Sequence, residues 1–187
     1  MRIVGGEWRG RALTPVGKGD AGAHLRPTSD RVREALFNVL SGGRLGDPIT
    51  DAHVLDLFAG TGALGLEALS RGAAHVTFVD DGPKARELIS RNIGLLDARD
   101  RTRLIRRDAT RLGANTDNPA CALVFLDPPY GKGMGARALA AAREGGWIAP
   151  GAVIVWDEST PQETPQGMTQ LDQRRYGDTW ITILENG

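Results

Sequence analysis

The sequence predicts an α/β fold, in which a wound, mostly parallel sheet of seven strands ends in an antiparallel hairpin. Short apolar runs alternate with helical patterns along most of the chain, which is typical of parallel strands joined by helices. The last two apolar runs are separated only by the tight turn Tyr176-Gly177-Asp178. So short a connection indicates antiparallel neighbours, because parallel strands need a crossover of a dozen or more residues.

The chain opens with a segment that precedes this alternation, and we expect an extension there rather than a domain. Its glycines and turn residues predict a short hairpin over 2–14 and a loop over 15–25. A helix should run from about 29 to 41, because Thr28 or Ser29 can cap it and apolar residues recur on one face. The strands are predicted near 53–58, 75–80, 102–107, 122–126, 152–157, 169–175 and 179–184. The helices between them are predicted near 63–71, 83–96 and 134–144.

A rigid corner, Asp127-Pro128-Pro129-Tyr130, follows the apolar run 122–126. Neither proline nitrogen can donate a hydrogen bond, and each proline restricts the residue before it, so the strand must stop there. The corner suits a planar base that carries an exocyclic amine. Asp127 and the Pro128 carbonyl can each accept one N–H, while Tyr130 covers the ring face. The alternative interpretation is an ordinary turn at the end of a strand.

A glycine-rich turn, Phe58-Ala59-Gly60-Thr61-Gly62, follows the first of these strands. Glycines at 60, 62 and 65 allow the backbone to approach a ligand and the next helix to pack tightly on the strand. The second strand ends in Asp80, at the position that holds ribose hydroxyls in wound α/β sheets; Asp81 is the alternative. Because the loop lacks the basic residue of a P-loop, the pattern predicts a nucleoside site rather than a triphosphate site.

The corner and the glycine loop together resemble the S-adenosylmethionine-dependent amino methyltransferases of nucleic acid bases. Further stretches narrow the resemblance to the bacterial RsmD family, which methylates the N2 amine of one guanosine in small-subunit (16S) ribosomal RNA. These stretches are RIVGGEWRGR at 2–11, LRPTSDRVREALFN at 25–38 and LSRGA at 69–73. The resemblance implies a Rossmann-like class I methyltransferase domain over 46–187, an RNA-binding extension over 1–45, and S-adenosyl-L-methionine as cofactor.

Topology and resemblance give each candidate residue an expected role. Wound sheets bind ligands at the carboxyl ends of their strands, so Asp56 should lie near the methionine amino group and Asp80 at the ribose. Asp108 and the Ala109 amide should meet the adenine. The expected cofactor-binding set is Asp56, Phe58, Gly60, Thr61, Gly62, Asp80, Asp108, Ala109 and, by resemblance, Thr28. The expected catalytic set is Asp127, Pro128, Pro129 and Tyr130.

Charge is unevenly distributed in a chain whose formal net charge is zero. Residues 1–45 hold eight Arg or Lys and four Asp or Glu, which gives +4 and leaves −4 for the remainder. Such a basic segment favours phosphate binding. The expected RNA-binding set is Trp8, Arg9, Arg11, Arg26, Arg31 and Arg33. The alternative for the last three is pairing with Asp30 and Glu34. A second basic cluster, which can contact RNA or simply be solvated, is Arg99, Arg101, Arg103, Arg106, Arg107 and Arg111.

Composition narrows the possible classes of protein further. The apolar runs are shorter than the roughly 20 residues of a membrane-spanning helix, and the single cysteine, Cys121, excludes an internal disulfide and a cysteine-based zinc cluster. The histidines His24, His53 and His75 are too scattered to indicate a metal site. We therefore expect a cytoplasmic enzyme without a metal, and we take a monomer as the default. With the ribosomal substrate that the resemblance implies, the balanced charge favours RNA within an assembled or assembling 30S particle.

Other functions remain open at this level. The corner would serve the amine of adenine or cytosine in DNA as well, although the chain has no insertion large enough for a separate target-recognition domain. A non-catalytic RNA-binding module would need neither the acid at 127 nor the aromatic ring at 130. A small-molecule methyltransferase would leave the basic extension unexplained.

Overall fold

The computed structural model of the chain describes residues 1–17, 25 and 28–187. The helices are α1 (Asp30–Ser41), α2 (Ala63–Ser70), α3 (Pro83–Leu95) and α4 (Met134–Glu144), with short 3-10 turns η1 (Arg99–Arg101) and η2 (Ala109–Arg111). The strands are β1 (His53–Leu57), β2 (His75–Val79), β3 (Thr102–Ile105), β4 (Cys121–Leu126), β5 (Ile148–Glu158), β6 (Met168–Tyr176) and β7 (Thr179–Asn186).

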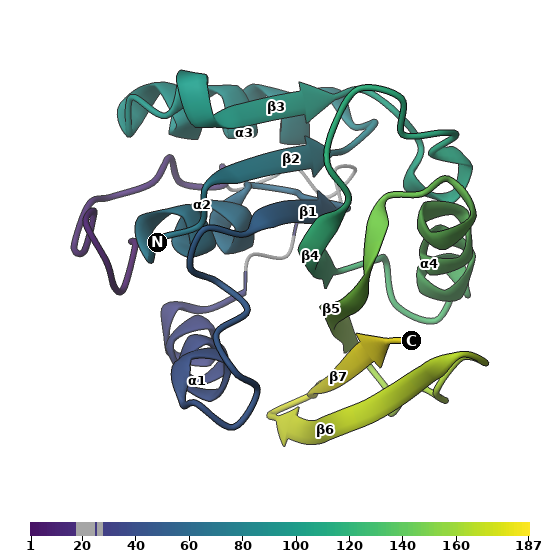
Figure 1. The fold of residues 1–187 in the computed structure, drawn as a ribbon. Coiled ribbons are helices and arrows are strands. Elements are labelled where there is room, and N and C mark those ends of the chain that lie inside the picture. The colour runs from purple at the N-terminus through teal and green to yellow at the C-terminus, as the bar shows by residue number, and fades with distance from the viewer. Residues whose placement is uncertain (18–24, 26–27) are drawn as a thin grey trace.

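All seven strands form one sheet in the order β3-β2-β1-β4-β5-β7-β6 (Figure 1). Strands β1 to β5 pair in parallel, whereas β7 pairs antiparallel with both β5 and β6. The predicted fold class is confirmed. The sequence order of the strands reverses direction between β1 and β4, so the carboxyl ends of these two strands flank the switch point at which wound sheets bind ligands.

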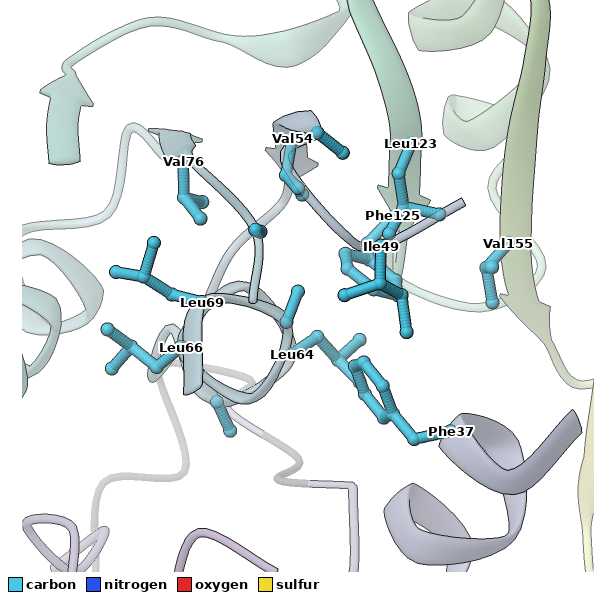
Figure 2. Packing of buried hydrophobic residues seen from close by; sticks show 14 of the residues in the cluster. Phe37, Ile49, Val54, Leu64, Leu66, Leu69, Val76, Leu123, Phe125 and Val155 are labelled. Carbon is cyan, nitrogen blue, oxygen red and sulfur yellow. The ribbon is translucent and has the colours of Figure 1, made fainter. Parts of the chain in front are cut away.

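Each face of the sheet carries its own core, because successive side chains along a strand point to opposite faces. Val54 and Val76 belong to the core that packs against α1, α2 and α3. Figure 2 shows part of it, with Phe37 of α1 reaching toward the strand residues. Leu55 and Val79 belong to the second core, which α4 covers. The helices thus cover both faces of the sheet, and the connecting loops lie at the carboxyl ends of its parallel strands.

The amino-terminal segment doubles back in a short hairpin, as predicted. Its arms form an antiparallel bridge between Arg2 and Ala12. Across the arms, the Ile3 amide donates to the Arg11 carbonyl at 3.0 Å and the Leu13 amide donates to the Met1 carbonyl at 2.9 Å. The amides of Val4 and Gly5 each donate to the Glu67 carboxylate of α2 at 2.9 Å. These two hydrogen bonds anchor the hairpin to α2.

The remaining boundaries lie close to those predicted. Ser29 caps α1, accepting a hydrogen bond from the Val32 amide at 3.2 Å. Strand β5 begins four residues earlier than predicted, at Ile148, and its pairing with β4 is irregular near Cys121. Most of the predicted loop over 15–25 lies outside the described residues. Within the described part of the chain, every helix is too short or too polar to cross a membrane.

Candidate active site

A cavity of about 350 Å³ lies at the carboxyl ends of β1, β2 and β4. Thr28, just before α1, contributes to its wall from outside the sheet. We call it the larger cavity. It is lined by Leu25, Thr28, Asp56, Phe58, Ala59, Gly60, Thr61, Ala63, Leu64, Val79, Asp80, Asp81, Gly82, Pro83, Lys84, Ala85, Arg107, Asp108, Ala109, Asp127, Pro128, Pro129 and Met134. The expected cofactor-binding residues are all among them except Gly62.

The glycine loop is shaped by backbone conformation. Phe58, Gly60 and Gly62 have φ values of 55°, 60° and 79°. A left-handed conformation is unusual for a residue as bulky as phenylalanine, and such strain is concentrated at functional sites. Gly62 is the cap residue of α2 and offers no side-chain hydrogen bond. Its role is therefore to turn the chain into the helix rather than to line the cavity.

Asp56 supplies the cap that Gly62 lacks. Its carboxyl group accepts a hydrogen bond from the Gly65 amide, in the first turn of α2, at 3.1 Å. A Cβ atom at Gly65 would lie 2.5 Å from Phe78, so only glycine allows α2 this close to β2. Burial raises the pKa of Asp56 well above its usual range, the Gly65 hydrogen bond lowers it, and the charge of Asp80 raises it again.

Asp80 is held in the cavity wall by two backbone amides. Its carboxylate oxygens accept hydrogen bonds from Gly60 at 2.9 Å and from Gly82 at 2.8 Å. Burial raises the pKa of Asp80, and these two hydrogen bonds oppose the rise. Asp81 also lines the cavity, but its side chain is exposed. Asp80 is thus the acid that the fold fixes at this point.

Asp108 lies further along the same wall, after β3. It accepts hydrogen bonds from the Thr110 hydroxyl at 2.7 Å and from the Thr110 amide at 2.9 Å. These hydrogen bonds lower the pKa of Asp108, so the group is ionised at neutral pH. Ala109, the next residue, is buried and begins η2. A fixed acceptor and a neighbouring backbone group thus face the cavity together.

The predicted corner divides between two cavities. Asp127, Pro128 and Pro129 line the larger one, whereas Tyr130 lines a second, smaller cavity of about 210 Å³. The walls of the smaller cavity are Thr28, Ser29, Val32, Asp127, Tyr130, Asp157 and Thr179. Thr28 and Asp127 belong to both walls. They therefore mark the place where contents of the two cavities can meet.

Tyr130 is fixed through its hydroxyl. The hydroxyl donates to Asp157 Oδ1 of β5 at 2.7 Å and lies 2.8 Å from the Thr179 hydroxyl of β7. Burial raises the pKa of Tyr130, and the nearby charges of Asp157 and Asp127 raise it further. The phenol therefore stays protonated at neutral pH and acts as a hydrogen-bond donor, not as a base.

Comparison with known proteins identifies the class of this site. The family model described as conserved hypothetical protein 95 matches residues 1–185. Ribosomal RNA small subunit methyltransferase D of Escherichia coli (strain K12) is 39% identical over 165 residues, which cover 88% of this chain and 78% of that protein. The protein of the same name from Haemophilus influenzae is 34% identical over 190 residues, covering 100% of this chain and 94% of its own.

The chain belongs to this family, the RsmD family. The resemblance read from the sequence is confirmed, and the chain is a methyltransferase. A solved structure of the Escherichia coli protein yhhF is 34% identical, with a TM-score of 0.83, and the match covers 100% of this chain and 97% of that one. The class I methyltransferase fold is confirmed as well.

Sequence reasoning missed the residues of this RsmD-family chain that hold the corner from the far side. Asp157 and Thr179 fix Tyr130, and Glu158 accepts a hydrogen bond from the Gly131 amide at 3.2 Å. A signal was present: two acids end an apolar strand that directly follows, in the sheet, the strand carrying the corner. The contacts of Asp157 with Tyr130 and of Glu158 with Gly131 depend on strand order, which the pattern alone does not give.

Two residues expected to bind RNA are buried, and this expectation is corrected. Arg33 is fully buried and donates to Glu67 at 3.0 Å and to Asp30 at 2.9 Å. Pairing with Asp30 was the alternative interpretation. Trp8 is 7% exposed, and the Arg101 guanidinium lies 4.9 Å from the centre of its ring. A buried cation and a covered ring stabilise the fold and cannot contact a phosphate.

The other expected RNA contacts have different positions. Arg9, Arg11 and Arg31 are exposed, and Arg11 also donates to the Leu95 carbonyl at 2.6 Å. Arg26 lies outside the described residues.

Among the described residues, no group of three or more His, Cys, Asp or Glu could hold a metal ion.

Proposed function

We propose that this enzyme transfers a methyl group from S-adenosyl-L-methionine to the N2 exocyclic amine of a guanosine in small-subunit ribosomal RNA. The observation that carries the proposal is that Asp127 lies in the wall of both cavities. An acceptor at this position can hold an amine between a methyl donor in one cavity and the rest of its base in the other. The names of the similar proteins support ribosomal RNA as the substrate.

The larger cavity fits the cofactor through its polar groups. Asp80, fixed by the Gly60 and Gly82 amides, can accept the two ribose hydroxyls. Asp108 and the Ala109 amide can pair with the edge of the adenine. Asp56 is close enough to the cavity to favour the methionine ammonium, directly or through water. When bound, S-adenosyl-L-methionine supplies a methyl group on a sulfonium and leaves as S-adenosylhomocysteine.

The corner residues act on the amine. The guanine N2 lone pair is delocalised into the ring, which makes the amine a weak nucleophile. Asp127 and the Pro128 carbonyl orient its two hydrogens and favour a pyramidal nitrogen whose lone pair points into the larger cavity. The amine loses one proton as its bond to the methyl carbon forms, and Asp127 is placed to accept it. Alignment of this kind can supply on the order of 7–11 kcal/mol of the acceleration.

The target base enters through the smaller cavity, next to Tyr130. An unpaired or loop base is the easier target, because unstacking a base costs a few kcal/mol. Arg9, Arg11 and Arg31 would contact phosphates from the extension over 1–45. We further propose that the enzyme is a cytoplasmic monomer acting on an assembled or assembling 30S particle, whose proteins would add binding surface to a chain of zero net charge.

Methyl transfer from labelled S-adenosylmethionine, followed by nucleoside analysis, tests the proposal. The substrates are small ribosomal subunits lacking the modification, the RNA extracted from them, and unmethylated duplex DNA. Label in N2-methylguanosine is the expected result, with the particle as the better acceptor. Label in DNA as N6-methyladenine or N4-methylcytosine would overturn the substrate assignment, and absence of label despite measurable cofactor binding would overturn the reaction.

A further inference from the structure

The smaller cavity contains a second carboxylate that the proposed reaction does not use. Asp157 lies at the carboxyl end of β5, pairs in register with Ile181 of β7, and is 6% exposed. It lines the same cavity as Asp127. Burying a charged group is costly unless hydrogen bonds compensate for the lost water. Asp127 and Asp157 are thus two hydrogen-bond acceptors in the wall of one cavity of about 210 Å³, and both can accept donors from a molecule bound there.

The known contacts of Asp157 fix its place in the cavity. Its Oδ1 accepts the Tyr130 hydroxyl at 2.7 Å, and that hydroxyl also lies 2.8 Å from the Thr179 hydroxyl. The carboxylate is thus held by a residue of the corner itself. An ionised carboxylate offers about four lone-pair sites, so it can receive a donor from a bound base in addition to the tyrosine.

Guanine presents the donors that such a pair of acids matches. Its N1–H and its N2 amine are adjacent donors on the Watson–Crick edge, where enzymes that take a base out of the stack read it. Adenine has an acceptor at N1 and no amine at C2. A base whose amine is bound by Asp127 would present its N1 to the remainder of the same cavity, where the second carboxylate lies.

We propose that Asp157 is a specificity-determining residue that accepts the N1–H of the target guanine while Asp127 and the Pro128 carbonyl hold the N2 amine. This inference rests on the proposed function and deepens it. Asp157 recognises the base, and through its hydrogen bond to Tyr130 it also sets the position of the aromatic ring. A base with an unprotonated N1 would place that acceptor opposite the Asp157 carboxylate, which is an acceptor as well. A site that hydrogen-bonds a donor of its substrate discriminates strongly against an analogue that lacks the donor.

The test compares guanosine with 2,6-diaminopurine riboside at the acceptor position, once that position has been mapped on the ribosomal substrate. Both bases carry the 2-amine, but diaminopurine has an acceptor at N1. The analogue 2-aminopurine, which has no substituent at C6, controls for the change at that position. The wild-type enzyme should prefer guanosine over both analogues by on the order of 100-fold or more in kcat/KM.

Asp157→Asn should shift this preference. The amide oxygen can still accept the Tyr130 hydroxyl, while the amide NH2 can donate to an N1 acceptor. We expect the preference for guanosine to fall at least tenfold through both a slower reaction of guanosine and a faster reaction of the analogues. Thr179→Val is the matched control: it removes the other partner of the Tyr130 hydroxyl and should slow all three bases with their ratios unchanged.

The outcomes separate this inference from the proposed function. An Asp157→Asn enzyme that binds cofactor normally but keeps the wild-type ratios would overturn the inference and leave the function standing, since Asp157 would then only position Tyr130. Equal wild-type rates on guanosine and diaminopurine would also overturn it, even if the variant fails to fold. Absence of N2-methylguanosine from the wild-type reaction would instead contradict the proposed function itself.

Discussion

The two cavities of the site are built in different ways. In the larger one, Asp80 and Asp56 are held by backbone amides of the glycine loop and its flanking turns: Asp80 by Gly82 and Gly60, two and 20 residues away, and Asp56 by Gly65, nine residues away. In the smaller one, Tyr130 is held by side chains 27 and 49 residues away. The first follows from one contiguous motif, and the second exists only once the sheet has formed. We therefore expect a substitution confined to one cavity to leave the binding properties of the other cavity intact.

The largest effect is expected from Asp127→Ala, which removes the acid shared by both cavities. Turnover of the ribosomal substrate should fall on the order of 1,000-fold or more, because the amine loses its orienting acceptor. Cofactor affinity, measured by calorimetry, should change little, since the amides that hold Asp80 are intact. Asp127→Asn keeps one acceptor oxygen, so its turnover should lie between those of the wild type and the alanine variant. Substantial turnover by the alanine variant would show that the corner does not orient the amine.

The next largest effect is on the free energy of unfolding, through the contacts that fix α1 next to the wall shared by both cavities. Thr28 precedes α1, and α1 is fixed to α2 by the buried pair of Arg33 with Glu67, which also binds Arg71. Glu67→Gln leaves the Arg33 guanidinium without its buried countercharge and should lower the free energy of unfolding by about 3–5 kcal/mol. Urea denaturation measures this change.

Asp30→Asn is the matched control, because Asp30 pairs with the same arginine but its side chain is 43% exposed. It should change the free energy of unfolding by less than about 1 kcal/mol. Equal effects of the two substitutions would mean that burial of the Arg33–Glu67 pair does not decide the stability of this region.

Asp80→Ala should affect the larger cavity alone. It removes a charged acceptor of the ribose hydroxyls and of the Gly60 and Gly82 amides, so cofactor affinity should fall roughly 10- to 100-fold. At saturating cofactor, turnover should remain within a few-fold of wild type. Asp81→Ala, at the exposed neighbouring acid, is the control and should leave affinity nearly unchanged. The reverse ranking of the two variants would assign the ribose to Asp81.

The last expected effect is a dependence of stability on pH. The pKa of Asp56 is raised by burial, so between 3.8 and the pKa in the folded chain the folded state binds more protons than the unfolded state. The contribution of this group to stability is full below pH 3.8 and is lost as the pH rises through the folded value. Asp56→Asn cannot titrate, so the difference between wild type and variant should decline as pH rises. A difference that is constant with pH would contradict the buried position of the acid.

Much of the fold and of the larger cavity could be predicted from the sequence. Asp56, Gly60 and Asp80 lie in a strand–loop–helix–strand pattern whose hydrogen bonds are local, so the pattern already contains their geometry. Ser29 likewise caps α1 from the adjacent residues. For such groups the neighbours in sequence are also the neighbours in space.

The rest depended on packing that sequence patterns do not record. Trp8 and Arg33 lie in basic surroundings, which indicated an RNA surface, yet both are buried against other elements. Arg33 of α1 can be buried because the Glu67 carboxylate of α2, 34 residues away in the sequence, accepts a hydrogen bond from its guanidinium. Asp157 and Thr179 were missed for the same reason, since only the strand order β4-β5-β7 brings them to Tyr130.

A crystal structure of the enzyme with S-adenosylhomocysteine and an RNA fragment containing the acceptor guanosine tests the central claim most directly. The account predicts the cofactor ribose at Asp80, its adenine at Asp108, its sulfur facing Asp127, and the guanine in the smaller cavity with its N2 amine at Asp127. A guanine bound elsewhere, or a cofactor whose sulfur faces away from Asp127, would contradict it.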